Sequence, residues 1–210
     1  MESARKPVGP SLVLGFLVVI VSMFLLFTVP PRLFVAATFT STTCMIAVTY
    51  FLTRYRGLFR PRAATIALGV ATAAALYLVF YLGNLGVTSL HPFGISVASE
   101  NSIYSLIASP SNPLYIQVAV LGFDAVGYES FFRGVLQARL EPSTGVGSVF
   151  IAAMIDALLH LVTLNPLWVV TTFIADSVWG LTYYYSKDLT SSITSHFVWD
   201  VAIFVLLPIR

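Results

Sequence analysis

The sequence consists largely of apolar runs that are about as long as a membrane is thick. A helix needs about 20 mainly apolar residues to cross the hydrocarbon core of a bilayer. By this measure the chain holds seven candidate segments, which are residues 12–29, 33–53, 63–87, 113–139, 146–164, 167–186 and 190–208. We therefore predict an all-α fold: a polytopic membrane helical bundle of about seven transmembrane helices.

The composition agrees with a membrane location and excludes some other classes. Of the 210 residues, 58% are hydrophobic and only 10% are charged, which is far less charge than a soluble domain of this length carries. The net charge of +2 is small and the basic residues are scattered over short connectors. This distribution excludes a nucleic-acid surface and fits contact with membrane lipids. Cys44 is the only cysteine, so an intrachain disulfide is excluded.

The basic residues also predict an orientation. Cytoplasmic loops of membrane proteins carry an excess of lysine and arginine. With seven helices and a cytoplasmic N-terminus, only Arg32 and Arg210 fall on the outer side. We therefore predict a multi-pass integral protein, in the plasma membrane, with its N-terminus in the cytoplasm. The basic residues that would share the cytoplasmic side are Arg5, Lys6, Arg54, Arg56, Arg60, Arg62, Arg139 and Lys187.

Ionisable residues inside the apolar segments of the second half are the main clue to function. A charged group at the centre of a membrane helix costs about 2.5–3.5 kcal/mol on insertion scales. Such groups therefore occur where they pair, face a wet cavity or take part in chemistry. Eight of them lie within or at the edges of four segments: Asp124, Glu129, Arg133, Asp156, His160, Asp176, His196 and Asp200.

Three of the segments carry pairs of these residues four positions apart. Side chains at this spacing stand one above the other on a helix. Glu129 and Arg133 form one such pair and can neutralise each other. The strings DALLH and HFVWD place a carboxylate one turn from a histidine, an arrangement used by general bases and around metal ligands. Asp176 has no such neighbour, and its role stays open.

The order and spacing of these residues resemble the CAAX-protease and bacteriocin-processing family (CPBP, or Abi) of intramembrane peptidases. That family carries EExxxR, usually followed by glycine, then FxxxH, then HxxxN or HxxxD. The resemblance covers about residues 113–207. It predicts a catalytic core over residues 113–210 and an N-terminal three-helix region over residues 1–112, within one membrane domain. The matching positions are Glu129, Arg133, Gly134, His160, His196 and Asp200.

Two positions depart from the family pattern. Tyr128 stands where the family has its first glutamate, and Asp156 stands where it has phenylalanine. In the family that glutamate and the histidine of the second motif are held to activate the attacking water. A tyrosine, with a reference pKa near 10, is a poor base for this task. Either Asp156 or Glu129 supplies the carboxylate, or the protein is catalytically inactive and binds its partner as a scaffold.

The resemblance implies an intramembrane endopeptidase in which a water between His160 and Glu129 or Asp156 attacks a peptide bond near the bilayer. His196, backed by Asp200, would stabilise the oxyanion, and Arg133 would keep Glu129 ionised. The expected partners are peptides or lipidated or transmembrane proteins.

A metalloprotease-like site stays open at this point. Two histidines and one acid are a common zinc set. If a divalent metal such as zinc is bound, the candidate ligands are His160, His196 and Glu129. The compact HExxH motif is absent from the sequence. The other functional class that remains is a proton-coupled carrier, because acids and histidines inside helices also form proton relays.

Overall fold

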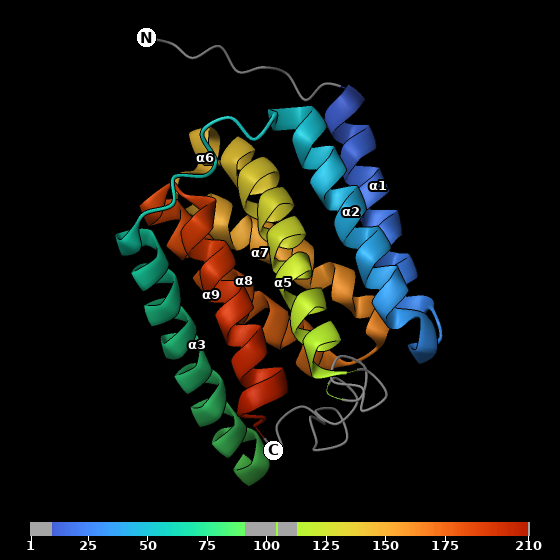
Figure 1. The fold of residues 1–210 in the computed structure, drawn as a ribbon, viewed down its shortest axis with the longest axis vertical. Coiled ribbons are helices and arrows are strands. Elements are labelled where there is room, and N and C mark those ends of the chain that lie inside the picture. Colours follow the sequence, from blue (N-terminus) through green and yellow to red (C-terminus); the bar gives the residue numbers. More distant parts are fainter. Residues whose placement is uncertain (1–9, 91–103, 105–112, 210) are drawn as a thin grey trace.

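The computed structural model describes residues 10–90, 104 and 113–209. This part of the chain is helical and contains no strand, so the predicted all-α membrane bundle is confirmed (Figure 1). Most of the predicted loop 88–112, and the basic residues of the first nine positions, lie outside the described residues. The helices are α1 (Pro10–Thr28), α2 (Phe34–Thr53), α3 (Ala63–Leu90), α5 (Leu114–Phe131), α6 (Ala138–Thr144), α7 (Gly147–Leu159), α8 (Pro166–Ser186) and α9 (Leu189–Val201).

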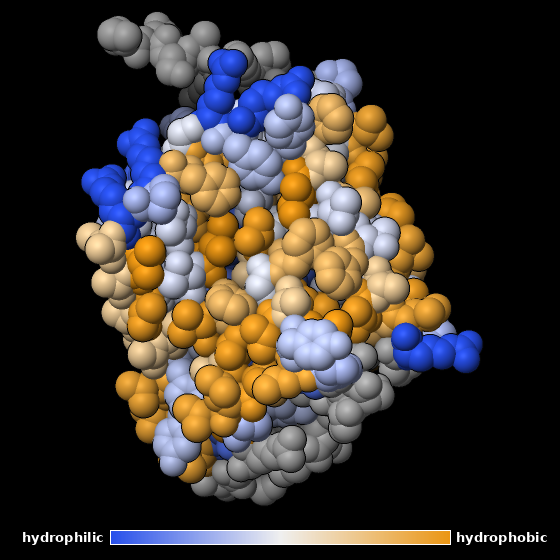
Figure 2. Space-filling model, viewed as in Figure 1, coloured by the Kyte–Doolittle hydropathy of each residue, from blue (hydrophilic) through white to orange (hydrophobic). Residues whose placement is uncertain are grey.

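Four stretches of the described chain are long and apolar enough to cross a membrane. They are Pro10–Thr28, Phe34–Thr53, Ala63–Gly86 and Leu189–Leu206, and Gly147–Thr163 is a shorter apolar helix. On the face drawn in Figure 2, hydrophobic residues cover most of the bundle and hydrophilic residues gather near its ends. This is the surface of a protein whose sides face lipid.

One helix ends later than its predicted segment, and two others change helix type near their predicted ends. After α5 the chain continues through a π-helical segment, Phe132–Gln137, into α6, so this helix ends beyond the predicted residue 139. Pro142 lies inside α6, and the helix stops only at Gly145, where φ is 55° and ψ is −130°, a combination that glycine readily adopts and other residues do not. A 3-10 turn, His160–Thr163, follows α7, and a second π-helical segment, Ala202–Leu206, follows α9.

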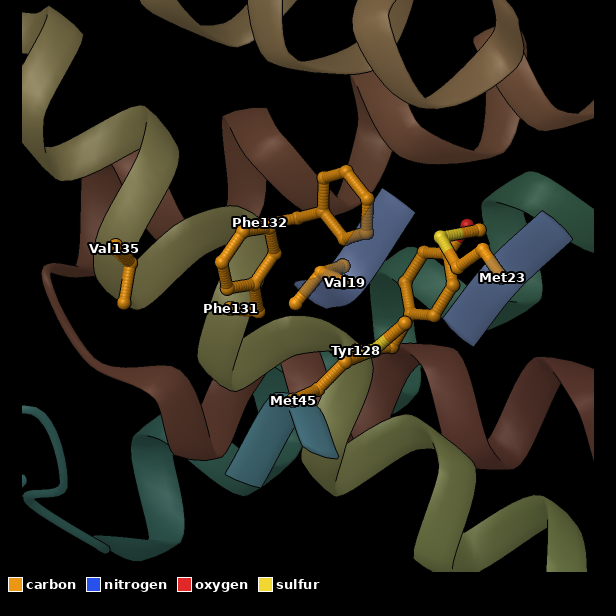
Figure 3. Close-up of a cluster of buried hydrophobic side chains, with 7 residues drawn as sticks. All are labelled: Val19, Met23, Met45, Tyr128, Phe131, Phe132 and Val135. Carbon is orange, nitrogen blue, oxygen red and sulfur yellow. The ribbon is translucent and has the colours of Figure 1, made fainter. Parts of the chain in front are cut away.

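A cluster of buried apolar side chains joins α1 and α2 to the helix that carries the first motif. Figure 3 shows the ring of Tyr128 beside Met23 of α1, with Met45 of α2 near the same helix. Phe131 and Phe132 are almost fully buried in this cluster. The packing fixes the position of the Tyr128 ring within the bundle.

Glycines allow the early helices to approach the later ones closely. A Cβ atom at Gly127 of α5 would lie 2.5 Å from Cγ2 of Thr42 in α2. A Cβ atom at Gly69 of α3 would lie 2.6 Å from the main-chain oxygen of Ser191 in α9. Both distances are too short for any larger residue, so small residues set the helix spacing here. The division into residues 1–112 and 113–210 stays a prediction.

The basic connectors meet at one end of the bundle. The main-chain nitrogen of Arg60 donates to Oδ1 of Asp188 at 3.0 Å, and the nitrogen of Leu189 donates to the oxygen of Leu58 at 2.9 Å. Lys187 forms an ion pair with Glu141 at the end of α6. The loop between α2 and α3 is therefore held against the turn between α8 and α9.

Candidate active site

The structure brings all six predicted site residues into the interior of the bundle. Glu129, Arg133 and Asp156 have no exposed surface, and His160, His196 and Asp200 are each only 5% exposed. They come from α5 and its π-helical extension, the end of α7, and α9. Residues up to 71 positions apart in the chain thus share one buried polar region, which also includes Asp176 of α8.

Arg133 neutralises two carboxylates at once. Its Nε lies 3.3 Å from Oε2 of Glu129, which confirms the predicted pair, and its Nη2 lies 2.7 Å from Oδ1 of Asp176. Arg133 belongs to the π-helical segment, and such segments occur frequently at functional sites. Asp176, whose role the sequence left open, is therefore the second partner of the buried arginine. The signal was available in the charges, because Arg133 is the only lysine or arginine among the eight ionisable residues of the four later segments.

The imidazole of His196 lies between two carboxylates. Its Nδ1 is 3.0 Å from Oε1 of Glu129, and its Nε2 is 3.4 Å from Oδ2 of Asp200. The ring stacks on Trp179, with centroids 3.7 Å apart and planes 11° apart. Both oxygens of Glu129 are thus engaged, one by His196 and the other by Arg133. This arrangement orients His196 and leaves Glu129 little freedom to bind a water.

The imidazole of His160 is held in one tautomer by its own helix. Its Nδ1 lies 3.0 Å from the main-chain oxygen of Asp156 and 3.8 Å from Oδ1 of the same residue. A carbonyl oxygen can only accept, so Nδ1 carries the hydrogen and the neutral ring keeps a lone pair on Nε2. Phe27 and Trp168 pack against the ring at centroid distances of 4.8 and 5.9 Å.

The two residues that depart from the family pattern contact each other. The hydroxyl of Tyr128 donates a hydrogen bond to Oδ2 of Asp156. The carboxyl group of Asp156 also lies within hydrogen-bond reach of Asp176. A carboxylate from α7 therefore lies beside the position at which the family places a carboxylate on α5.

A cavity of about 150 Å³ connects most of these groups. His160, His196 and Asp156 line it, whereas Glu129 and Arg133 are not among the described residues of its wall. Glu129 and Arg133 thus lie behind the wall and act on the cavity through their partners. The other polar and ionisable lining residues include Asp124, Tyr128, Asp176, Asp200, Thr38, Gln117, Thr171 and Thr172.

Asp124 of α5 is a member of this wall that the motif comparison did not select. Thr42 of α2 donates a hydrogen bond of 2.7 Å to its Oδ1. The signal in the sequence was the spacing, because Asp124 lies one turn before Tyr128 on the same helix. Its contact with Thr42 was not visible in the sequence, because it joins helices 82 positions apart.

The proposed zinc set does not fit this geometry. Within the described part of the chain, no three His, Cys, Asp or Glu side chains are grouped so that they could hold a metal ion. Glu129 and both nitrogens of His196 already face protein partners. We therefore propose no chemical step at a metal.

The fold and this buried site define a polytopic membrane protein with a cavity between its early and later helices, whose acids and histidines come from the later ones. Residues 110–202 match the family described as type II CAAX prenyl endopeptidase Rce1-like. This match confirms the CAAX-protease resemblance drawn from the motifs, and the region that carries the site is similar to that family. No curated protein and no solved structure gives a significant match.

Proposed function

We propose that this protein is an intramembrane endopeptidase of the CAAX-protease type that works with a histidine-activated water. The observation that carries the proposal is the hydrogen bond from Tyr128 to Asp156 in the wall that also holds His160. Asp156 supplies from α7 the carboxylate that α5 lacks at position 128. Asp156 and the proposed base, His160, then lie one helical turn apart in the chain.

In this mechanism, Nε2 of His160 accepts a proton from the water as the water oxygen attacks the peptide carbonyl carbon. The nearby carboxylate of Asp156 stabilises the imidazolium that forms, as the acid does beside other catalytic histidines. His160 then returns the proton to the departing amide nitrogen as the C–N bond breaks. The products are a carboxylate and an amine.

His196 stabilises the oxyanion of the tetrahedral intermediate. Its Nε2 is 3.4 Å from Asp200, a long contact that leaves this N–H able to donate to a substrate oxygen. Glu129 orients the ring through Nδ1, and Arg133 keeps Glu129 ionised. Glu129 and Arg133 are positioning residues in this mechanism, and His160, Asp156 and His196 are the groups that meet the substrate.

The substrate is a peptide segment of a membrane-embedded or lipidated protein, because the cavity lies within a bundle whose sides face lipid. The lining residues Phe27, Phe34 and Gln117 come from the helix ends opposite the basic loop 54–62. We propose that the protein lies in the plasma membrane and that this loop and the N-terminus are on the cytoplasmic side. The cavity then opens towards the outer side, which disfavours a cytoplasmic CAAX protein as the substrate.

Turnover of a transmembrane reporter peptide by the purified protein in detergent tests this function. Asp156→Asn and His160→Gln should each lower kcat by about 10²–10⁴-fold, the usual contribution of a general base and its partner, with little change in KM. Glu141→Gln should behave like the wild type, because Glu141 lies on α6 outside the cavity. Full activity in the His160 variant, or a wild type that binds the reporter without cutting it, would contradict the proposal.

A further inference from the structure

The wall of the cavity is acidic. Lysine and arginine are absent from its described lining residues. Arg133, the buried cation nearby, lies behind the wall and is paired with Glu129 and Asp176. The carboxyl groups that line the cavity are those of Asp124, Asp156, Asp176 and Asp200, against the two imidazoles.

Asp124 differs from the other acids in its exposure and in its partner. It is partly exposed, whereas Asp156 and Asp176 have no exposed surface. Its hydrogen-bond donor is the neutral hydroxyl of Thr42, and the described residues place no lysine, arginine or histidine within 4 Å of its carboxylate oxygens. A carboxylate that faces a low-dielectric cavity with only a neutral partner favours a positive charge brought by a ligand.

Two fully buried acids of the same wall lie close together. The carboxyl groups of Asp156 and Asp176 are within hydrogen-bond reach of each other. The hydroxyl of Tyr128 donates to Oδ2 of Asp156, and Nη2 of Arg133 lies 2.7 Å from Oδ1 of Asp176. This part of the wall is therefore rich in acceptors, and an ammonium group, which offers three donors and no acceptor, matches it.

We propose that Asp124 is a specificity-determining residue that binds an ammonium group of the substrate next to the scissile bond. The group is a lysine side chain or a free α-amino group. This inference rests on the proposed peptidase function and specifies its substrate. The same wall disfavours substrates that place a carboxylate in the cavity, because like charges repel strongly at low dielectric.

The close approach of α2 and α5 holds Asp124 in place for this role. Thr42 contacts both Gly127 and Asp124, one turn apart on α5. Because Thr42 fixes Oδ1, the second oxygen of Asp124 is left for the ligand. Tyr128, which bonds Asp156, lies one turn further along the same face, about 6 Å from Asp124 along the axis of α5.

Binding and cleavage of three matched peptides test the inference. The peptides are labelled with a fluorophore, capped at both ends, and carry lysine, norleucine or glutamate at one position beside the cleavage site. A fourth peptide, with norleucine and a free N-terminus, distinguishes a side-chain ammonium from an α-amino group. We expect the wild type in detergent at low salt to bind the best ammonium peptide about tenfold or more tighter than the capped norleucine peptide, as expected for a desolvated charge pair.

Asp124→Asn should reduce this ratio to near one, and Asp124→Glu should retain part of it. Glu141→Gln removes a carboxylate outside the cavity and should leave the ratio unchanged. Wild-type affinity for both ammonium peptides equal to that for the capped norleucine peptide, or a preference that survives in Asp124→Asn, would overturn the inference. Binding is measured apart from turnover. A wild type that prefers an ammonium peptide but cuts no peptide would therefore refute only the proposed peptidase function. Cleavage without charge preference would refute only the role of Asp124.

Discussion

The hydroxyl of Tyr128 donates a hydrogen bond to the carboxylate of Asp156, so the two departures from the family's motifs are in direct contact. Compared with the family pattern, α5 carries a tyrosine in place of the acid at position 128, and α7 carries an acid at position 156. The tyrosine hydroxyl orients this carboxylate. The two departures therefore act on the same part of the site.

Tyr128→Phe should lower kcat and leave KM nearly unchanged. The substitution keeps the ring that packs beside Met23 and removes only the donor to Asp156. Hydrogen bonds to charged groups contribute about 1.5–3 kcal/mol, which corresponds to roughly a 10- to 100-fold loss in rate. Tyr77→Phe is the matched control, because the Tyr77 hydroxyl bonds to the oxygen of Leu207 outside the cavity. Equal rates for the two variants would refute the role of the Tyr128 hydroxyl.

Arg133→Gln should destabilise the protein strongly. Its removal leaves Glu129 and Asp176 buried without a counter-charge, and breaking a buried ion pair in this way costs about 3–5 kcal/mol. Unfolding in mixed detergent and denaturant measures the change. Arg139→Gln, at an exposed position six residues later, should change the stability by less than about 0.5 kcal/mol. Similar losses in both variants would show that the buried pairs contribute no special stability.

Asp188 should make the stability of the turn before α9 depend on pH. Burial raises the pKa of this carboxyl, but the amide hydrogen bonds from Arg60 and Thr190 outweigh burial, so the pKa lies below its ordinary value. Its unfolded pKa is about 3.9. The contribution of the charge is therefore present above about pH 4 and is lost as the pH falls through the lower folded pKa.

Asp188→Ala should accordingly cost about 0.5–2 kcal/mol at pH 7, the usual loss for a helix N-cap, and distinctly less near pH 3. Thermal unfolding of wild type and variant at the two pH values measures the difference. A cost that is the same at both pH values would contradict the role of the ionised carboxylate.

The side of the membrane to which the cavity opens can be read by chemical labelling. In a Cys44→Ser background, Leu164→Cys introduces a thiol where the side chain is 91% exposed, four residues after His160. Arg56→Cys introduces one in the basic loop. A membrane-impermeant maleimide applied to intact cells should label Leu164→Cys and not Arg56→Cys. The reverse pattern would place the cavity on the cytoplasmic side and restore CAAX proteins as candidate substrates.

Part of this site could be predicted from the sequence because helices carry local information. Pairs four residues apart, such as Glu129 and Arg133, meet on any helix, and the motif order placed His160 and His196 near them. Contacts between helices are different, since they depend on rotation and spacing that no local pattern sets. The pairing of Arg133 with Asp176 and the bond from Thr42 to Asp124 are of this second kind.

The helix ends show the same limit. The apolar segment 113–139 was predicted to end at residue 139, but Pro142 is tolerated within α6 and the helix continues to Gly145. The π-helical segment Phe132–Gln137 was not visible either, because the apolar pattern of this stretch does not distinguish a π-helix from an α-helix.

We propose that Asp156 has the role that the first glutamate of the motif has in the family. The most direct test measures reporter cleavage by the wild type, Asp156→Phe, and the double variant Tyr128→Glu with Asp156→Phe, which restores the family pattern at both positions. We predict that the wild type cuts, that Asp156→Phe loses about 10²–10⁴-fold in rate, and that the double variant recovers most of the loss. Wild-type activity in Asp156→Phe, or activity in the double variant alone, would contradict the account.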